Sequence, residues 1–207
     1  MTAGMDEVAA IVLAGGRSQR MGQDKAALPL GGRTLLQRAV DAASEVATMV
    51  VIVGAPDRPL PEVACARPLR VVADAVEGEG PLAGIVAGLG ATDAPVAVIV
   101  GCDQPFVRPA LLRLLARRAQ EHIAVVPVME GKPQPLCSAV RLDALARLRA
   151  VFEGGGRAAM ALTELPGALL LPPEQWEAAD PDGRSFIGVN TPDELARAEA
   201  HIERFEV

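Results

Sequence analysis

The sequence predicts an α/β protein with a mostly parallel central sheet. Short β-rich apolar runs alternate with amphipathic helical patterns along the chain, which is typical of βαβ units. Half of the 207 residues are hydrophobic and 22% are charged, the ordinary balance of a folded globular protein. This length suits one domain, and because the chain has neither an internal repeat nor a linker, we expect a single domain over residues 1–207.

The predicted elements of the first half follow the order expected of βαβ units. The run VAAIVLA over residues 8–14 predicts the first buried strand, and residues 15–32 are too rich in glycine and charge to be core, so they predict a long loop. Thr34 is a suitable N-cap for a helix whose apolar stripe runs to residue 46. Two strands and then a helix of small residues follow, at residues 49–54, 70–73 and 80–90.

The second half continues this alternation and ends on a helix. The run VAVIV predicts a strand over residues 96–100, and leucines at helical spacing predict a helix over 109–120. Thr191 and Glu194 form a capping box that predicts a last helix through residue 202. The remaining predicted strands are residues 123–128, 136–140, 168–171 and 186–189, and the remaining predicted helices are residues 142–151 and 158–165.

Composition excludes several classes of partner. The net charge is −6 without a run of basic residues, and one Trp, four Phe and no Tyr leave almost no stacking platform, so we expect no nucleic-acid partner. The three cysteines are far apart and indicate neither a zinc site nor a disulfide framework. No stretch approaches the ~18 apolar residues of a membrane span, and the first residues are acidic rather than basic. We therefore expect a cytoplasmic protein without a membrane partner.

The loop after the first predicted strand, LAGGRSQRMGQDK from residue 13, is the most informative segment. Gly15 and Gly16 let the backbone turn and bring its N–H groups close to a ligand. Three cations then follow within nine positions, namely Arg17, Arg20 and Lys25. Backbone amides together with cations predict a polyphosphate-binding loop, whereas a glycine-rich surface loop with solvated arginines is the simpler alternative. Neither a Walker A motif nor GxGxxG is present.

Two aspartates follow predicted strands. Ligands of open α/β sheets bind outside the carboxyl ends of the strands, where Asp74 follows RVVA and Asp103 follows VAVIVGC. A carboxylate that faces a triphosphate at such a position is best explained as a Mg²⁺ ligand, which we expect for Asp103. A helix cap or a turn is the alternative for both residues.

The side chains present favour nucleotidyl transfer over hydrolysis. His122 and His201 lie in helical or helix-flanking segments and are expected at the surface, and Ser18 and Ser138 lack a base, which disfavours a Ser/His/Asp hydrolase. A phosphate ester is already ionised near neutral pH, so its attack on a nucleotide α-phosphate needs positioning and charge neutralisation rather than proton removal. Mg²⁺, lysine and arginine supply these.

The loop LAGGRSQRMGQDKAAL closely resembles the signature of the molybdenum cofactor guanylyltransferases, in the nucleotidyltransferase superfamily. Further matching motifs occur in the family's order: GPLAGIVAGL, GCDQPF, KPQPL, GGGR and VNTPDEL, from residues 80, 101, 132, 154 and 189. The resemblance covers nearly the whole chain. It implies a Rossmann-like three-layer fold of the nucleotide-diphospho-sugar transferase type. It also implies transfer of GMP from GTP to the terminal phosphate of molybdopterin, giving the guanine dinucleotide cofactor and pyrophosphate.

The resemblance also implies roles for individual residues. The residues expected to act in catalysis are Arg20, Lys25 and Asp103, with Asp103 as the Mg²⁺ ligand. The residues expected to bind the substrates are Leu13, Ala14, Gly15, Gly16, Arg17, Lys25, Asp74, Asp103, Arg157 and Asn190. Leu13, Ala14 and Gly15 would contact guanine and ribose through backbone groups, whereas Asn190 and Arg157 would face the pterin.

Three positions depart from the family's pattern. Many relatives have an Asn where this chain has Val53-Gly54, many have another Asn where it has Gly188, and Gln104 also occurs in cytidylyl relatives. A CTP-dependent molybdopterin cytidylyltransferase, or a transferase acting on a sugar or alcohol phosphate, is therefore the alternative. Intact Lys25 and Asp103 disfavour a silent nucleotide-binding adaptor. The expected partners are GTP and molybdopterin, with transient contact to cofactor-inserting proteins.

Overall fold

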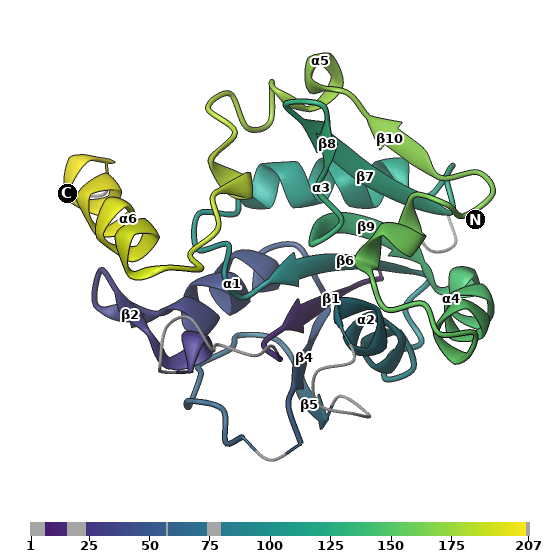
Figure 1. Ribbon diagram of the computed structural model, residues 1–207, viewed down its shortest axis with the longest axis horizontal. Coiled ribbons are helices and arrows are strands. Elements are labelled where there is room, and N and C mark those ends of the chain that lie inside the picture. The colour runs from purple at the N-terminus through teal and green to yellow at the C-terminus, as the bar shows by residue number, and fades with distance from the viewer. Residues whose placement is uncertain (1–6, 16–23, 57, 74–79, 206–207) are drawn as a thin grey trace.

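A mostly parallel eight-stranded sheet forms the centre of the computed structural model, which describes residues 7–15, 24–56, 58–73 and 80–205 (Figure 1). Its strand order is β10-β7-β9-β6-β1-β4-β5, and β8 pairs with β7 at one end. The strands are β1 (Val8–Leu13), β4 (Met49–Gly54), β5 (Leu69–Ala73), β6 (Val96–Gly101), β7 (Ala124–Met129), β8 (Lys132–Pro133), β9 (Cys137–Arg141) and β10 (Leu169–Leu171). A separate two-stranded hairpin joins β2 (Pro29–Leu30) to β3 (Arg33–Thr34).

Helices cover both faces of this sheet and complete a three-layer arrangement (Figure 1). The α-helices are α1 (Leu35–Ser44), α2 (Pro81–Leu89), α3 (Pro109–Arg118), α4 (Leu145–Glu153), α5 (Pro173–Trp176) and α6 (Pro192–Phe205). The 3-10 helices are η1 (Lys25–Ala27), η2 (Leu142–Ala144), η3 (Ala159–Leu162) and η4 (Arg184–Phe186). Within the described residues, no helix has both the length and the apolar character to cross a membrane.

The alternation of strand residues divides the core into two apolar layers. Val12 and Ile52 pack with α1 and α3 on one face, whereas Ile11 and Val53 pack with α2 and α4 on the other. This arrangement follows from the pleat, because successive side chains of a strand point to opposite faces. Strands covered on both faces are apolar throughout, which explains why the first strand appears as an unbroken hydrophobic run.

Strand β1 lies at the centre of the parallel part of the sheet. It pairs in parallel with β4 on one side and with β6 on the other, so that Leu13 is in register with both Val53 and Gly101. The carboxyl ends of β1, β4 and β6 therefore meet at the same edge. Because the chain order reverses around β1, this edge has the geometry of the crevice in which open α/β sheets bind ligands.

The structure confirms the α/β class and most of the predicted elements. One predicted strand, residues 186–189, is wrong. Arg184–Phe186 forms a 3-10 helix, and Val189 donates its N–H to the carbonyl oxygen of Asp103 at 2.8 Å instead of to a neighbouring strand. The apolar character of this segment comes from packing, since Val189 is fully buried in a cluster with Phe106.

Smaller differences concern local geometry. The predicted helix at residues 158–165 forms only the 3-10 helix η3. The second part of the predicted loop at residues 15–32 contains η1 and the first strand of the hairpin. Strand β9 is antiparallel to both β6 and β7, an arrangement that apolar runs alone do not reveal.

Helix α2 packs directly against β1 through its small residues. A Cβ atom added to Gly88 would stand 2.5 Å from Cγ2 of Ile11, and one added to Gly84 would stand 3.1 Å from Cδ2 of Leu13. Ile11 is fully buried in the middle of the sheet, so it has little freedom to move away. The glycines of this helix therefore set how closely it approaches the strand that leads to the site.

We expect Gly88→Ala to lower the free energy of unfolding by about 1–2 kcal/mol, because overpacking against buried Ile11 should cost about 2–3 kcal/mol and improved helix propensity returns about 1 kcal/mol. Gly84→Ala is the matched control, because the tip of Leu13 can shift, and its cost should be smaller. Urea unfolding followed by circular dichroism measures both. A Gly88→Ala protein as stable as the unsubstituted chain would contradict this packing.

Candidate active site

The first part of the site is the point where the chain leaves β1. Ala14 donates its N–H to the carbonyl oxygen of Val53 at 2.8 Å, and Cys102 donates its N–H to the carbonyl oxygen of Leu13 at 3.0 Å. Leu13 is buried, Ala14 is half-buried and Gly15 is exposed. These three predicted ligand-contacting residues thus run from the core to the surface at the carboxyl edge of the sheet. Gly16, Arg17, Arg20 and Asp74 lie outside the described residues, and their roles stay predictions.

Asp103 lies immediately after the next central strand. Gly101 ends β6, and a Cβ atom on it would stand only 2.6 Å from Oδ1 of Asp103. The absence of a side chain at Gly101 therefore gives the carboxylate the space that it occupies. Gln104 closes this turn by donating its N–H to the carbonyl oxygen of Gly101 at 3.0 Å, and it is buried. The Asp103 side chain keeps 23% of its surface exposed, so a ligand can reach it.

Lys25 brings a positive charge to the same place. It begins the short helix η1, whose N-cap Asp24 accepts a hydrogen bond from the N–H of Ala26 at 3.1 Å. The ammonium Nζ of Lys25 donates to Oδ1 of Asn190 at 2.5 Å and lies 3.6 Å from Oδ2 of Asp103. The structure therefore brings together three of the predicted site residues, Lys25, Asp103 and Asn190, from three distant parts of the sequence.

Arg157 lies at the start of α2, on the face of the sheet that α2 and α4 cover. Its carbonyl oxygen accepts the N–H of Leu82 at 3.1 Å at the start of α2, and Gly80 approaches that oxygen so closely that a Cβ would stand 2.5 Å from it. Gly80 also has a φ of 83°, which other residues rarely adopt. The Arg157 guanidinium lies over the ring of Phe152, 4.6 Å from its centroid. The GGGR loop is thus fixed to the beginning of α2.

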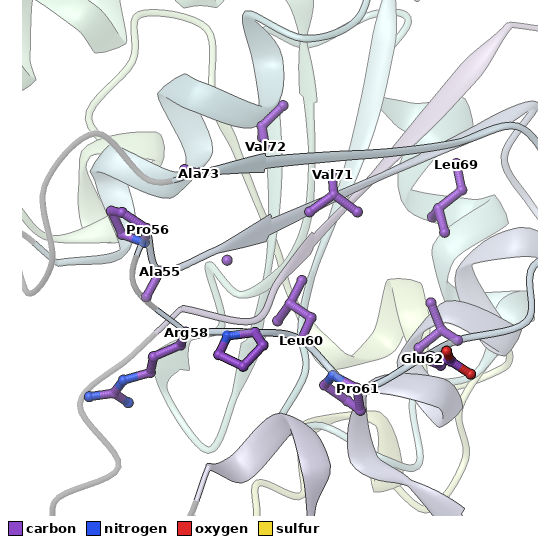
Figure 2. A pocket seen from close by; sticks show the side chains of 13 residues that line it. Ala55, Pro56, Arg58, Leu60, Pro61, Glu62, Leu69, Val71, Val72 and Ala73 are labelled. Carbon is purple, nitrogen blue, oxygen red and sulfur yellow. The ribbon is translucent and has the colours of Figure 1, made fainter.

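An apolar groove of about 620 Å³ opens beside the same edge, between β5 and the connection that precedes it (Figure 2). Figure 2 shows Arg58 and Leu60 on the connection and Val71 on the strand. A Cβ on Gly54 would stand 3.2 Å from Leu60, so this glycine lets the connection close over the end of β4. Gly54, noted above as a departure from the family's pattern, therefore brings no side chain to the end of β4.

Asp103 has the chemistry of a hard-metal ligand, although it stands without a group of other ligands. Among the described residues, no three His, Cys, Asp or Glu side chains form a cluster that could hold a metal ion. Mg²⁺ sites commonly use one or two carboxylates, with substrate phosphates and water completing the shell. Burial, and after it the Asp103 carboxylate, raises the pKa of the adjacent Cys102 thiol well above its usual range. That thiol is therefore neutral, and Asp103 supplies the charge.

Comparison with known proteins identifies the family. The profile of the MobA-like NTP transferase domain matches residues 10–168, which is more than half of the chain. The chain belongs to this family. A probable molybdenum cofactor guanylyltransferase from Chloroflexus aggregans is 38% identical over 203 residues, covering 93% of each chain. The molybdenum cofactor guanylyltransferase of Desulfosudis oleivorans is 33% identical over 201 residues, covering 96% of this chain and 98% of the relative.

Solved structures of other proteins share the fold. The molybdopterin-guanine dinucleotide biosynthesis protein A of Archaeoglobus fulgidus superposes with a TM-score of 0.78 at 25% identity, covering 95% of this chain and all of that one. The 2-C-methyl-D-erythritol 4-phosphate cytidylyltransferase of Thermus thermophilus gives a TM-score of 0.70 at 22% identity, covering 95% and 99%. The three-layer nucleotide-diphospho-sugar transferase fold implied by the sequence is therefore confirmed.

In this MobA-like domain, we expect Gly101→Ala to raise the divalent-ion concentration for half-maximal nucleotidyl transfer by about tenfold, or about 1.4 kcal/mol of binding. The added Cβ would displace the Asp103 carboxylate, which is the end of a flexible side chain, so stability should change by less than about 1 kcal/mol. Gly90→Ala is the matched control, because its Cβ meets nothing closer than 3.4 Å. A metal requirement unchanged by Gly101→Ala would refute this steric role.

Proposed function

We propose that this chain transfers the GMP part of GTP to the terminal phosphate of molybdopterin and releases pyrophosphate. The observation that carries the proposal is the Lys25 ammonium 3.6 Å from the Asp103 carboxylate, at the carboxyl edge beside the end of β1. Relatives up to 38% identical over most of the chain are named as molybdenum cofactor guanylyltransferases, which favours GTP over CTP. We propose that residues 1–207 act as one nucleotidyltransferase domain in the cytoplasm.

The proposed nucleotide site uses the residues at the end of β1. Leu13, Ala14 and Gly15 would bind guanine and ribose through backbone groups, with the exposed Gly15 as the residue that a ligand reaches first. Gly16, Arg17 and Arg20 would extend this contact along the phosphates, and Asp74 would contact the nucleotide. These four assignments come from the sequence.

We propose that Asp103 holds Mg²⁺, with phosphate oxygens of GTP as further ligands. A partly exposed carboxylate beside a lysine, without a cluster of three ligands among the described residues, supports a metal shared with the substrate rather than a closed protein site. A protein of similar fold from Mycobacterium tuberculosis has been solved as a complex with manganese, at 19% identity and a TM-score of 0.65. When bound, the metal would supply Lewis-acid stabilisation of charge on the phosphates.

Lys25 would neutralise negative charge on the triphosphate. Its ammonium is a compact point charge with three donors, and it already lies close to the proposed metal ligand. The acceptor phosphate is ionised at neutral pH, so its oxygen can form the new bond to the α-phosphorus without a base. The bond from the α-phosphorus to the bridging oxygen then breaks, and pyrophosphate leaves with that electron pair. The residues of the site therefore act by orientation and charge.

The acceptor would approach from the side of Asn190 and Arg157. Asn190 lies next to Lys25, and Arg157 lies at the start of α2 on the other face of the sheet. An acceptor in contact with both residues would have to span the carboxyl edge of the sheet. Transient contact with cofactor-inserting proteins is part of the same proposal.

The choice of nucleotide is tested by incubating the protein with molybdopterin, Mg²⁺ and each labelled nucleoside triphosphate in turn. We expect label to enter the dinucleotide product from GTP. Incorporation from CTP but not from GTP would reassign the chain to the cytidylyltransferases. Transfer to a sugar or alcohol phosphate but not to molybdopterin would overturn the proposed acceptor.

Lys25→Ala and Asp103→Ala should each lower the rate of transfer by on the order of 10²–10³-fold, because each removes charge aimed at the phosphates. Both side chains are partly exposed, so the thermal unfolding midpoint should stay within a few degrees of the unsubstituted value. Asp93→Ala removes a carboxylate from an exposed position and serves as the control. Near-normal turnover in either site variant would show that the phosphate or metal role belongs to another residue.

A further inference from the structure

The position of the Lys25 ammonium is set more closely by an amide than by a carboxylate. Its Nζ lies 2.5 Å from Oδ1 of Asn190 but 3.6 Å from Oδ2 of Asp103. Only the first distance is that of a direct hydrogen bond, and a donor with full charge makes such a bond strong. A lysine side chain has four rotatable bonds, so the partner that fixes its end decides where the charge lies.

The backbone of Asn190 is in turn fixed by the first turn of α6. Its N–H donates to Oε2 of Glu194 at 2.6 Å, and the N–H of Glu194 donates to Oγ1 of Thr191 at 3.2 Å. The bond to Thr191 is the first half of the capping box expected from the sequence. The second half differs, because Glu194 accepts from Asn190, one residue before the N-cap Thr191, and not from Thr191 itself. The carboxylate of Glu194 therefore holds the backbone of the residue that contacts Lys25.

Two further contacts place the Asn190 amide relative to Asp103. Val189 donates its N–H to the carbonyl oxygen of Asp103 at 2.8 Å, which ties together the backbones that bear the two side chains. A Cβ on Gly188 would stand 3.0 Å from Nδ2 of Asn190, so this glycine leaves room for the amide. The glycine that departs from the family's pattern thus borders the side chain that contacts Lys25.

We propose that Glu194 and Asn190 are positioning residues for Lys25. Glu194 holds the backbone of Asn190, and Asn190 holds the ammonium beside the Asp103 carboxylate. This role rests on the proposed function, in which Lys25 acts on the phosphates. It assigns to the start of α6 a part in nucleotidyl transfer, in addition to its part in the stability of the helix.

The chain has two lysines, Lys25 and the exposed Lys132, which allow a direct measurement of the ammonium. Brief acetylation followed by mass spectrometry gives the reactivity of Lys25 relative to that of Lys132. We expect Glu194→Ala to raise this ratio at least about twofold, because the amide that restrains the amine is released. Glu194→Gln keeps an oxygen acceptor and should restore the ratio.

The same variants are then assayed for transfer with saturating GTP and molybdopterin. Glu194→Ala should lower kcat by about tenfold with a smaller change in KM, because misplacement of a catalytic charge affects the reacting complex most. Asp193→Ala is the matched control, since it removes another acid of the first turn whose side chain is exposed. Asn190→Ala removes the side chain that contacts Lys25 and leaves in place the two backbone N–H bonds made by residues 190 and 194.

The outcomes separate the positioning role from the proposed function. A Lys25 ratio unchanged in both Glu194→Ala and Asn190→Ala would overturn the positioning role, whatever the activity. An equal effect of Asp193→Ala would also overturn it, because the cause would then be general fraying of the helix. If the unsubstituted chain transfers no nucleotide while the Lys25 ratio still responds to Glu194→Ala, the proposed function fails and the positioning contact stands.

Discussion

The site depends on one constraint, the parallel pairing of β1 with a strand on each side. Because Leu13 is in register with both Val53 and Gly101, three strands end together and the chain must turn away from the sheet at this point. The carboxyl edge formed in this way is where open α/β sheets bind ligands. Gly88 lets α2 pack closely against Ile11 of the same strand, so the strand that leads to the site has little freedom to move.

The charged groups of the site are added to this edge from elsewhere in the chain. Asp103 follows β6, Lys25 begins the short helix η1, and Asn190 lies just before α6. Each is fixed through its backbone: Asp24 caps η1, and Val189 links the carbonyl group of Asp103 to the last segment. The rigid part of the site is therefore its backbone, and the side chains have only short distances to span.

Much of this arrangement could be predicted from the sequence because its causes are local. Buried strands such as residues 8–14 appear as apolar runs, and the N-cap bond between Thr191 and Glu194 depends on residues three apart. The error at residues 186–189 has the opposite origin: Val189 is apolar because it packs against Phe106, a contact that no local pattern records. The bond between Lys25 and Asn190 joins residues 165 positions apart, and only the folded chain reveals it.

That separation has a consequence for the order in which the protein becomes competent during synthesis. Lys25 leaves the ribosome early and β6 follows, yet the residue that restrains the lysine is made only after all the strands of the sheet. A nascent chain can therefore complete its hydrophobic layers before the hydrogen bond between Lys25 and Asn190 forms. The hydrogen bond between Lys25 and Asn190 forms only when the segment that leads into α6 has packed in place. A chain interrupted before this segment would keep a folded sheet but lack this contact of the site.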